Sequence, residues 1–225
     1  MSIKEKLLLS PLYDWFGKRS YAQAGEDIIA NIILDKKKKG VYVDVGAFHP
    51  KLFSNTYLFY KKGWSGVCVE PRPGAVAGFA KVRPRDKFIG IGAGAKKDVL
   101  EYFEFKESAA NTFSRRQAEK NIKEAGRKLL RKVNVAVMPL GDILASVGLG
   151  GAPIDLMSVD VEGMDEEVLL SNDWKMFQPR VLIVEDLEFD VEKPQKSRVY
   201  KMLSGLGYKL VAKTPYSLIF LITRE

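Results

Sequence analysis

The sequence predicts a single α/β domain with a mostly parallel sheet that ends in an antiparallel pair of strands. Short apolar runs typical of strands alternate with helix-like stretches from residue 41 onward, which favours a parallel sheet covered on both faces. The last two strand-like runs flank Thr214 and Pro215 too closely for a parallel crossover. A length of 225 residues with 46% hydrophobic residues is enough for one core of this kind.

The expected elements follow one another without a second-domain boundary over residues 1–225. An N-terminal helical segment over 1–39 precedes a core over 40–225, and one of its helices begins near Tyr21 and runs through Ile33. Strands are expected at 40–46, 65–71, 87–94, 99–105, 134–139, 154–163 and 180–188, with two more within 208–222. Helices are expected at 54–62, 73–82, 114–131, 140–147, 164–170 and 194–206, the last with Pro194 in its first turn.

The end of the chain narrows the fold class. A seven-stranded, mostly parallel sheet with a C-terminal antiparallel hairpin is the Rossmann-like architecture of class I methyltransferases. Dinucleotide-binding Rossmann dehydrogenases lack that ending. The strongly charged helical stretch 114–131 is expected as an insert in this core.

The first strand, turn, helix and second strand form a nucleoside-type cofactor site. Asp44 stands near the end of the first strand, and Gly46 in the turn lets a ligand approach the backbone closely. Glu70 ends the second strand, where an acid can accept hydrogen bonds from two ribose hydroxyls. Ligands bind at these carboxyl ends of parallel strands.

A dinucleotide or phosphate-loop site is the rival interpretation, and the glycines argue against it. The first turn reads GAFHPK rather than G-x-G-x-x-G, and the run from Gly90 to Gly94 is not followed by Gly-Lys-Ser/Thr. That later run, which contains Gly92 and Ala93, is expected to let the backbone approach the adenine side of the cofactor.

Acids follow the fourth and fifth core strands at the edge of the sheet that carries the cofactor site. Asp160 and Glu162 are two residues apart in SVDVEG, and Glu185 and Asp186 end the next strand. Such acids can orient an acceptor hydroxyl, act as a base, or bind Mg²⁺ through Asp160, Glu185 and Asp186. Alternatively, Glu162 and Asp165 serve only the N-terminus of the next helix.

Two further polar groups are candidates near the cofactor. His49, the sole histidine, has an ordinary pKa near ~6.5 that suits proton abstraction, although a hydrogen-bonding role in its own turn is equally consistent with its position. Gln23, with Glu26 and Asp27, can cover the pocket, or the two acids can simply favour the helix N-terminus.

The composition of the chain limits which partners and which location are expected. A formal charge of +8 favours anionic partners such as nucleic acid, phosphosugars or a membrane face, yet no nucleic-acid-binding motif is present. Cys68 lies within a strand pattern and is expected to be a buried, inert thiol. No apolar run approaches the ~20 residues of a membrane span, and Leu7–Leu9 is too short for a signal peptide, so a cytoplasmic protein is expected.

Three segments together resemble the FkbM family of S-adenosylmethionine-dependent methyltransferases. They are YAQAGEDIIANIIL, VYVDVGAFHPKLFSNTYLFYKKGWSGVCVEP, and IDLMSVDVEGMDEEVL followed by PRVLIVE, and they span roughly residues 21–185. The combination of SNT, GW, EP and DVEG carries the resemblance, whereas His49-Pro50 departs from the small or polar residue and glycine common there.

The resemblance implies S-adenosylmethionine as cofactor and O-methylation, often of a sugar or natural-product hydroxyl. It places Asp44, Gly46 and Ala47 beside the methionine part, Glu70 at the ribose, and Asp160 and Glu162 toward the acceptor. Expected cofactor contacts are Gln23, Asp44, Gly46, Ala47, Phe48, Ser54, Asn55, Thr56, Glu70, Pro71, Arg72, Gly92, Ala93 and Asp160. Expected catalytic residues are His49, Asp160, Glu162 and Glu185.

Two other functions remain open at this point. The basic charge is consistent with an RNA ribose or cap methyltransferase, and the fold is consistent with a non-catalytic binding module of a glycan-synthesis assembly.

Overall fold

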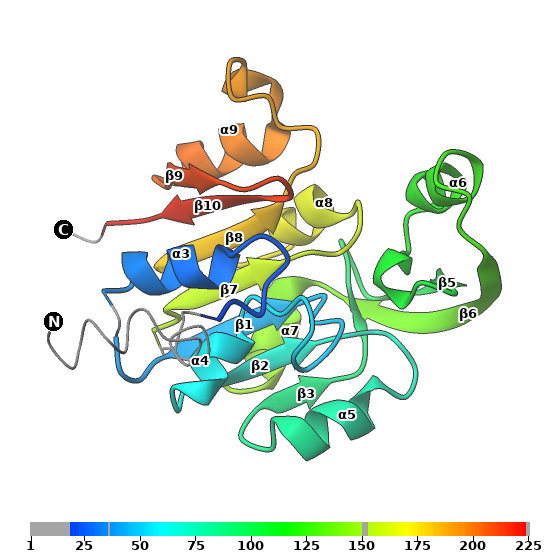
Figure 1. Cartoon of the computed structure of the whole chain (residues 1–225), viewed down its shortest axis with the longest axis horizontal. Helices are drawn as coiled ribbons and strands as arrows, with labels where there is room; N and C mark the ends of the chain where they lie inside the picture. Colours follow the sequence, from blue (N-terminus) through cyan, green and yellow to red (C-terminus); the bar gives the residue numbers. More distant parts are fainter. Residues whose placement is uncertain (1–18, 36, 150–152, 224–225) are drawn as a thin grey trace, which may run out of the picture.

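A computed structural model describes residues 19–35, 37–149 and 153–223, and it confirms the predicted class I methyltransferase architecture. The main sheet has seven strands in the order β3-β2-β1-β7-β8-β10-β9 (Figure 1). The bounds are β1 Val41–Val45, β2 Ser65–Val69, β3 Lys87–Ile89, β7 Leu156–Val159, β8 Val181–Glu185, β9 Lys209–Lys213 and β10 Ser217–Leu221. The first five are parallel to one another, and β10 is antiparallel to both of its neighbours.

Helices cover both faces of this sheet because its inner strands are apolar on both sides. The first face carries α3 Glu26–Ile33, α4 Tyr57–Lys61 and α5 Ala75–Val82, packed on side chains such as Tyr42 and Ile219. The second carries α7 Leu140–Ser146, α8 Asp165–Leu170 and α9 Arg198–Gly205, packed on side chains such as Val43 and Leu218. In β1 the period of two therefore points Tyr42 and Asp44 to the first face, and Val43 and Val45 to the second.

Residues 92–138 form a second, smaller sheet with its own helix, which we call the lobe. Its strands run in the order β4-β6-β5, with bounds β4 Gly92–Ala93, β5 Asp98–Phe105 and β6 Leu129–Met138. Between β5 and β6 lie the short 3-10 helix η1 Ser108–Ala110 and the helix α6 Arg115–Lys123. In Figure 1 the long β5–β6 ribbon and α6 project away from the main sheet.

Four expectations about elements need correction. The helix expected to begin near Tyr21 begins only at Glu26. The helix expected over 114–131 ends at Lys123, and β6 begins at Leu129. The strand expected at 87–94 divides into β3 in the main sheet and β4 in the lobe. Pro194 opens the separate 3-10 helix η2 Pro194–Lys196, and α9 begins only after Ser197, whose hydroxyl accepts a hydrogen bond from the Tyr200 N–H.

The N-terminal helical segment is described only from residue 19 onward. Residues 1–18, including Leu7–Leu9, lie outside the described residues. No helix in the described ranges has the length and apolar character that crossing a membrane requires. Cys68 is buried as expected, and burial raises the pKa of its thiol.

Candidate functional site

A cavity of about 740 Å³, part of it open to solvent, lies at the carboxyl ends of β1, β2 and β7 and against the lobe. The main sheet contributes residues at or just beyond the ends of β1, β2 and β7, and the lobe contributes side chains from β4, β5 and η1. The lining residues are Gln23, Val45, Gly46, Phe48, Phe53, Val69, Glu70, Pro71, Gly92, Ala93, Tyr102, Ser108, Ala109, Asn111, Thr112, Phe113, Asp160, Val161, Glu162 and Met164.

Glu70 is the buried acid of this cavity. It follows the last residue of β2 and is 4% exposed. One carboxylate oxygen accepts a hydrogen bond from the Phe48 N–H and the other from the Arg72 N–H, each at 2.8 Å. Burial raises the pKa of Glu70, and the two N–H donors oppose that rise. A carboxylate offers about four acceptor positions, so two remain for ligand hydroxyls, as a ribose requires.

Gly46 is required by the packing of two turns rather than by a ligand. Its φ is +78°, and a Cβ there would lie 1.7 Å from the carbonyl oxygen of Asp160. The turn after β1 and the turn after β7 can therefore meet only with glycine at this position. Their close contact brings Asp160 to the cavity beside Gly46.

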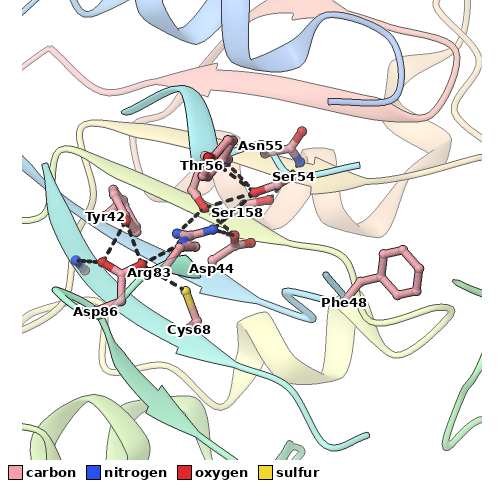
Figure 2. Close-up of polar contacts among 12 residues, drawn as sticks. Tyr42, Asp44, Phe48, Ser54, Asn55, Thr56, Cys68, Arg83, Asp86 and Ser158 are labelled. Carbon is pink, nitrogen blue, oxygen red and sulfur yellow. Dashed lines mark hydrogen bonds and ion pairs between the residues drawn. The ribbon is translucent and has the colours of Figure 1, made fainter. Parts of the chain in front are cut away.

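Asp44 does not line the cavity. Its carboxylate lies on the opposite face of β1, where the Thr56 hydroxyl donates to it and Arg83 lies 3.8 Å away. The Arg83 guanidinium also donates to Thr56 at 2.8 Å and to Asp86 at 2.7 Å. Figure 2 shows this buried network, with the Phe48 ring pointing away from it. Arg83 and Asp86 are not predicted from the sequence, where their only signal is an arginine three residues before an acid.

The segment Ser54–Thr56 also lies outside the cavity lining. The Asn55 amide donates to the Ser158 hydroxyl at 2.9 Å, which ties the start of α4 to β7. The Ser54 hydroxyl accepts a hydrogen bond from the Tyr57 N–H at 3.1 Å. The side chains of this segment therefore hold the start of α4 against the sheet and do not face the cavity.

The remaining residues that were predicted to contact the cofactor lie in or near the loop after β1 or in the cavity wall. Pro71 lines the cavity and Ala47 does not. Arg72 lies behind the loop, where its guanidinium donates to the Phe48 carbonyl at 2.8 Å and lies over the Phe48 ring at 5.8 Å. Gln23, Gly92 and Ala93 line the cavity as expected residues of its wall.

Asp160, Glu162 and Glu185 come together although they belong to two strand ends. One oxygen of each lies within 4.8 Å of the others. Burial first, and then the neighbouring acids, raise the pKa of Asp160 well above its usual range, that of Glu162 to about 7 and that of Glu185 to about 11. Three carboxyl groups at this separation either share protons or hold a cation.

Asp186 and Asp165 are engaged elsewhere. The Asp186 carboxylate accepts a hydrogen bond from the Ser197 hydroxyl at 2.7 Å, at the start of α9. The Asp165 carboxylate accepts from the Val161 and Gly163 N–H groups and so holds the turn before α8. The group of Asp160, Glu162 and Glu185, which we call the acid triad, therefore contains Glu162 in place of the predicted Asp186.

His49 serves its own turn. Its Nδ1 accepts hydrogen bonds from the Lys51 and Leu52 N–H groups at 3.1 and 2.9 Å, and the residue does not line the cavity. Partial burial, together with Arg72 and Lys51, lowers the pKa of the imidazole.

Three cavity residues hold strained backbone conformations. Phe48, Phe53 and Glu162 are non-glycine residues with φ of +49°, +55° and +54°. Such conformations are costly for bulky side chains and gather at functional sites. The Glu162 turn is held by the lobe, because the Thr112 hydroxyl donates to the Glu162 carbonyl at 2.8 Å.

The lobe supplies the wall that the sequence analysis missed. The Tyr102 and Phe113 rings contact each other at 4.7 Å between centroids, and both line the cavity. The Asn111 side chain accepts a hydrogen bond from the Phe105 N–H at 2.8 Å and so shapes the adjoining loop. None of these residues belongs to a motif, so their sequence carries no signal of a site.

One comparison with known proteins identifies a family. A model of the methyltransferase FkbM domain matches residues 44–210. A comparison with curated protein sequences finds no match.

Similar solved structures are methyltransferases with low sequence identity. TomG from Streptomyces achromogenes, solved with S-adenosylmethionine, is 13% identical with a TM-score of 0.46, covering 99% of this chain and 100% of that one. An O-methyltransferase from Bacillus cereus, solved with S-adenosylhomocysteine, is 9% identical with a TM-score of 0.44, covering 96% and 89%. A precorrin-6y C5,15-methyltransferase from Geobacter metallireducens is 13% identical with a TM-score of 0.45, covering 92% and 93%.

The family model spans about three quarters of the chain, including Glu70 and the turn that carries Asp160 and Glu162. The chain therefore belongs to the FkbM methyltransferase domain family.

Proposed function

We propose that this protein transfers a methyl group from S-adenosylmethionine to a hydroxyl of a sugar or glycan. The observation that carries the proposal is the cavity, which is lined both by Glu70, a buried carboxylate with free acceptor positions, and by Asp160 and Glu162 of the acid triad, with Glu185 next to them. Membership in a methyltransferase family supports methyl transfer as the reaction.

The residues at the ends of β1, β2 and β4 suit the donor. Glu70 would accept hydrogen bonds from the ribose hydroxyls, and the backbone of Gly92 and Ala93 would lie beside the adenine. Asp160, next to Gly46, would face the cationic methionine part. When bound, S-adenosylmethionine supplies the electrophilic methyl group.

Glu162 is our candidate for the base. Transfer forms a bond between the acceptor oxygen and the methyl carbon, breaks the bond between that carbon and sulfur, and releases the hydroxyl proton to a carboxylate. A pKa of about 7 suits this exchange near neutral pH, and the strained turn aims Glu162 at the cavity wall. Correct placement of the acceptor oxygen supplies much of the rate.

The lining also suits a sugar acceptor. Carboxylates are good acceptors for hydroxyl groups, and the Phe53 ring, 45% exposed, offers an apolar surface to the other face of a sugar ring. The Phe48 ring lies parallel to that of Phe53, with an interplanar angle of 18°.

The proposal is tested in two steps. Calorimetry should show binding of S-adenosylmethionine and S-adenosylhomocysteine to the purified protein. Tritiated-methyl transfer should then label a glycan pool in preference to RNA and small-molecule pools, with an EDTA arm to show whether the acid triad needs Mg²⁺. Absence of binding of either compound would refute the proposed donor, and label in RNA alone would refute the proposed acceptor.

A further inference from the structure

The positive charge of the protein is concentrated in one part of the lobe. Residues 106–132 carry nine lysines and arginines against three glutamates, a net charge of +6 out of +8 for the whole chain. The same stretch contains the cavity-lining residues of η1 and of the loop that follows it, Ser108 to Phe113. One segment of the lobe therefore holds most of the net positive charge and also forms part of the cavity wall.

Four exposed cations of this segment, which we call the basic rim, are Lys106, Arg115, Lys120 and Lys128. Within the described ranges, none of the four forms an ion pair within 4.0 Å, whereas Lys123, Arg131 and Lys132 each pair with a glutamate of the lobe. Unpaired exposed cations leave a positive surface potential that attracts anions.

Three residues of the basic rim lie close to cavity-lining residues. Lys106 lies two residues before the lining residue Ser108, and its N–H donates to the Lys128 carbonyl at 3.0 Å, which places these two residues side by side. Arg115 lies two residues after the lining residue Phe113, at the start of α6. Arg127 is close enough to the cavity residue Glu162 to oppose the rise of its pKa.

α6 packs against the rest of the lobe through one small apolar side chain and one amide, and its charged side chains are exposed. Ala118 and Asn121 are buried, and the Asn121 side chain donates to the Ala110 carbonyl and accepts from the Arg127 guanidinium. Arginines in the first turn of a helix are unfavourable for its dipole. Local stability therefore does not explain why Arg115 stands there, whereas Arg116 lies 4.0 Å from Glu188.

We propose that the basic rim binds the anionic groups of the acceptor, so that the acceptor is a saccharide bearing phosphate groups rather than a neutral sugar. The hydroxyl to be methylated enters the cavity while the phosphates lie on the rim. This inference rests on the proposed function and names the substrate class of the same site.

RNA fits the rim less well than a phosphosaccharide. Recognition of single-stranded RNA uses exposed aromatic rings on which bases stack. The lobe's Tyr102, Phe103 and Phe105 are buried, and its Phe113 faces the cavity. The lobe therefore offers charge without a stacking surface outside the cavity.

The test uses two triple variants with equal charge. Arg115→Glu/Lys120→Glu/Lys128→Glu changes the rim, and Lys81→Glu/Lys175→Glu/Lys201→Glu changes three exposed lysines on other elements; each leaves a formal charge of +2. The probes are a phosphorylated dextran oligosaccharide, neutral dextran of the same length, oligouridylate, and vesicles of phosphatidylglycerol in phosphatidylcholine. Calorimetry with S-adenosylmethionine is run on all three proteins.

We expect the unmodified protein to bind phosphorylated dextran over neutral dextran, and the rim variant to bind it about tenfold more weakly at low salt. The control variant should lose no more than about twofold. The inference would be overturned by equal losses of affinity in the two variants, or by equal affinity for phosphorylated and neutral dextran. It would also be overturned if the rim bound oligouridylate or the vesicles more tightly than phosphorylated dextran. Donor binding retained by both variants separates failure of this inference from failure of the proposed function.

Discussion

Glu70 presents its carboxylate to the cavity while each of its oxygens already accepts one backbone N–H. Replacing it by glutamine removes the charge and half of the acceptor capacity. We expect Glu70→Gln to weaken S-adenosylmethionine binding about 10- to 100-fold, because hydrogen bonds to charged groups contribute ~1.5–3 kcal/mol. Calorimetry measures the change, with the exposed Glu192→Gln as the matched control. Unchanged affinity in the Glu70 variant would remove this residue from the donor site.

Glu162 allows a second test at the same scale. Its pKa is raised to about 7, so a base at this position is protonated at pH 6 and ionised at pH 8. We expect the rate at saturating donor to rise with pH through about 7, and Glu162→Gln to lower kcat about 100-fold or more and remove that rise. Steady-state rates from pH 5.5 to 9 measure both effects. A glutamine variant that keeps the same profile would point to Asp160 or Glu185 as the base.

Single residues also show what the sequence could and could not predict. Glu70 and Asp160 could be placed at the cavity because each lies at the end of a predicted strand, and the carboxyl ends of parallel strands lie at the same edge of the sheet, where ligands bind. Asp44 is the last residue but one of a similar strand and faces the other way, since the period of two puts it on the same side as Tyr42. Its partner Arg83 is distant in sequence, and only the packing of α5 against the sheet brings the two together.

At the scale of elements, Arg83 joins the end of α5 to β1 and to the segment before α4. Its side chain is fully buried and contacts Asp44, Asp86 and Thr56. Arg83→Met leaves two buried carboxylates without their cation, and removing one partner of a buried pair costs about 3–5 kcal/mol. We expect a loss of that size in the free energy of unfolding, measured by urea titration. The exposed Lys81→Met on the same helix should change it by less than about 0.5 kcal/mol, and an equally small change in Arg83→Met would contradict this account.

The lobe marks the limit of prediction for elements. Strands β5 and β6 have the alternating patterns that identify strands. β5 was expected within one residue of its observed position, whereas only the second half of β6, from Asn134 onward, was expected as a strand. The charged pattern of 114–131 looked helical throughout, but Gly126, with φ of +62°, lies in the turn between α6 and β6. That the lobe would close the cavity could not be read from periodicity, which describes faces of elements and not how two sheets meet.

For the whole molecule, the acid triad makes stability depend on pH. Glu162 and Glu185 have pKa values of about 7 and 11 in the folded protein, against ~4.3 for an unfolded glutamate. For each glutamate, the folded state binds more protons than the unfolded state at any pH between its unfolded and its folded pKa. The free energy of unfolding therefore falls as pH rises through that interval, by up to about 1.4 kcal/mol per pH unit for each group.

We therefore expect the melting temperature of the ligand-free protein to fall from pH 5 to pH 8. Glu185→Gln should reduce that slope and raise the melting temperature at pH 8, because a neutral amide needs no proton to stay buried. Calorimetric melting at constant ionic strength measures both, and Glu192→Gln again serves as control. A melting temperature that rises over this range, or a Glu185 variant with an unchanged slope, would contradict the assignment.

The position of β10 has a consequence for synthesis on the ribosome. β10 lies between β8 and β9, although both precede it in the chain. Until Ser217–Leu221 has left the exit tunnel, β8 ends the sheet with an unpaired edge, and β9 has no neighbour with which to pair. The main sheet can therefore be completed only after β10 has emerged, and a chaperone that covers the edge of β8 would protect the nascent domain during that interval.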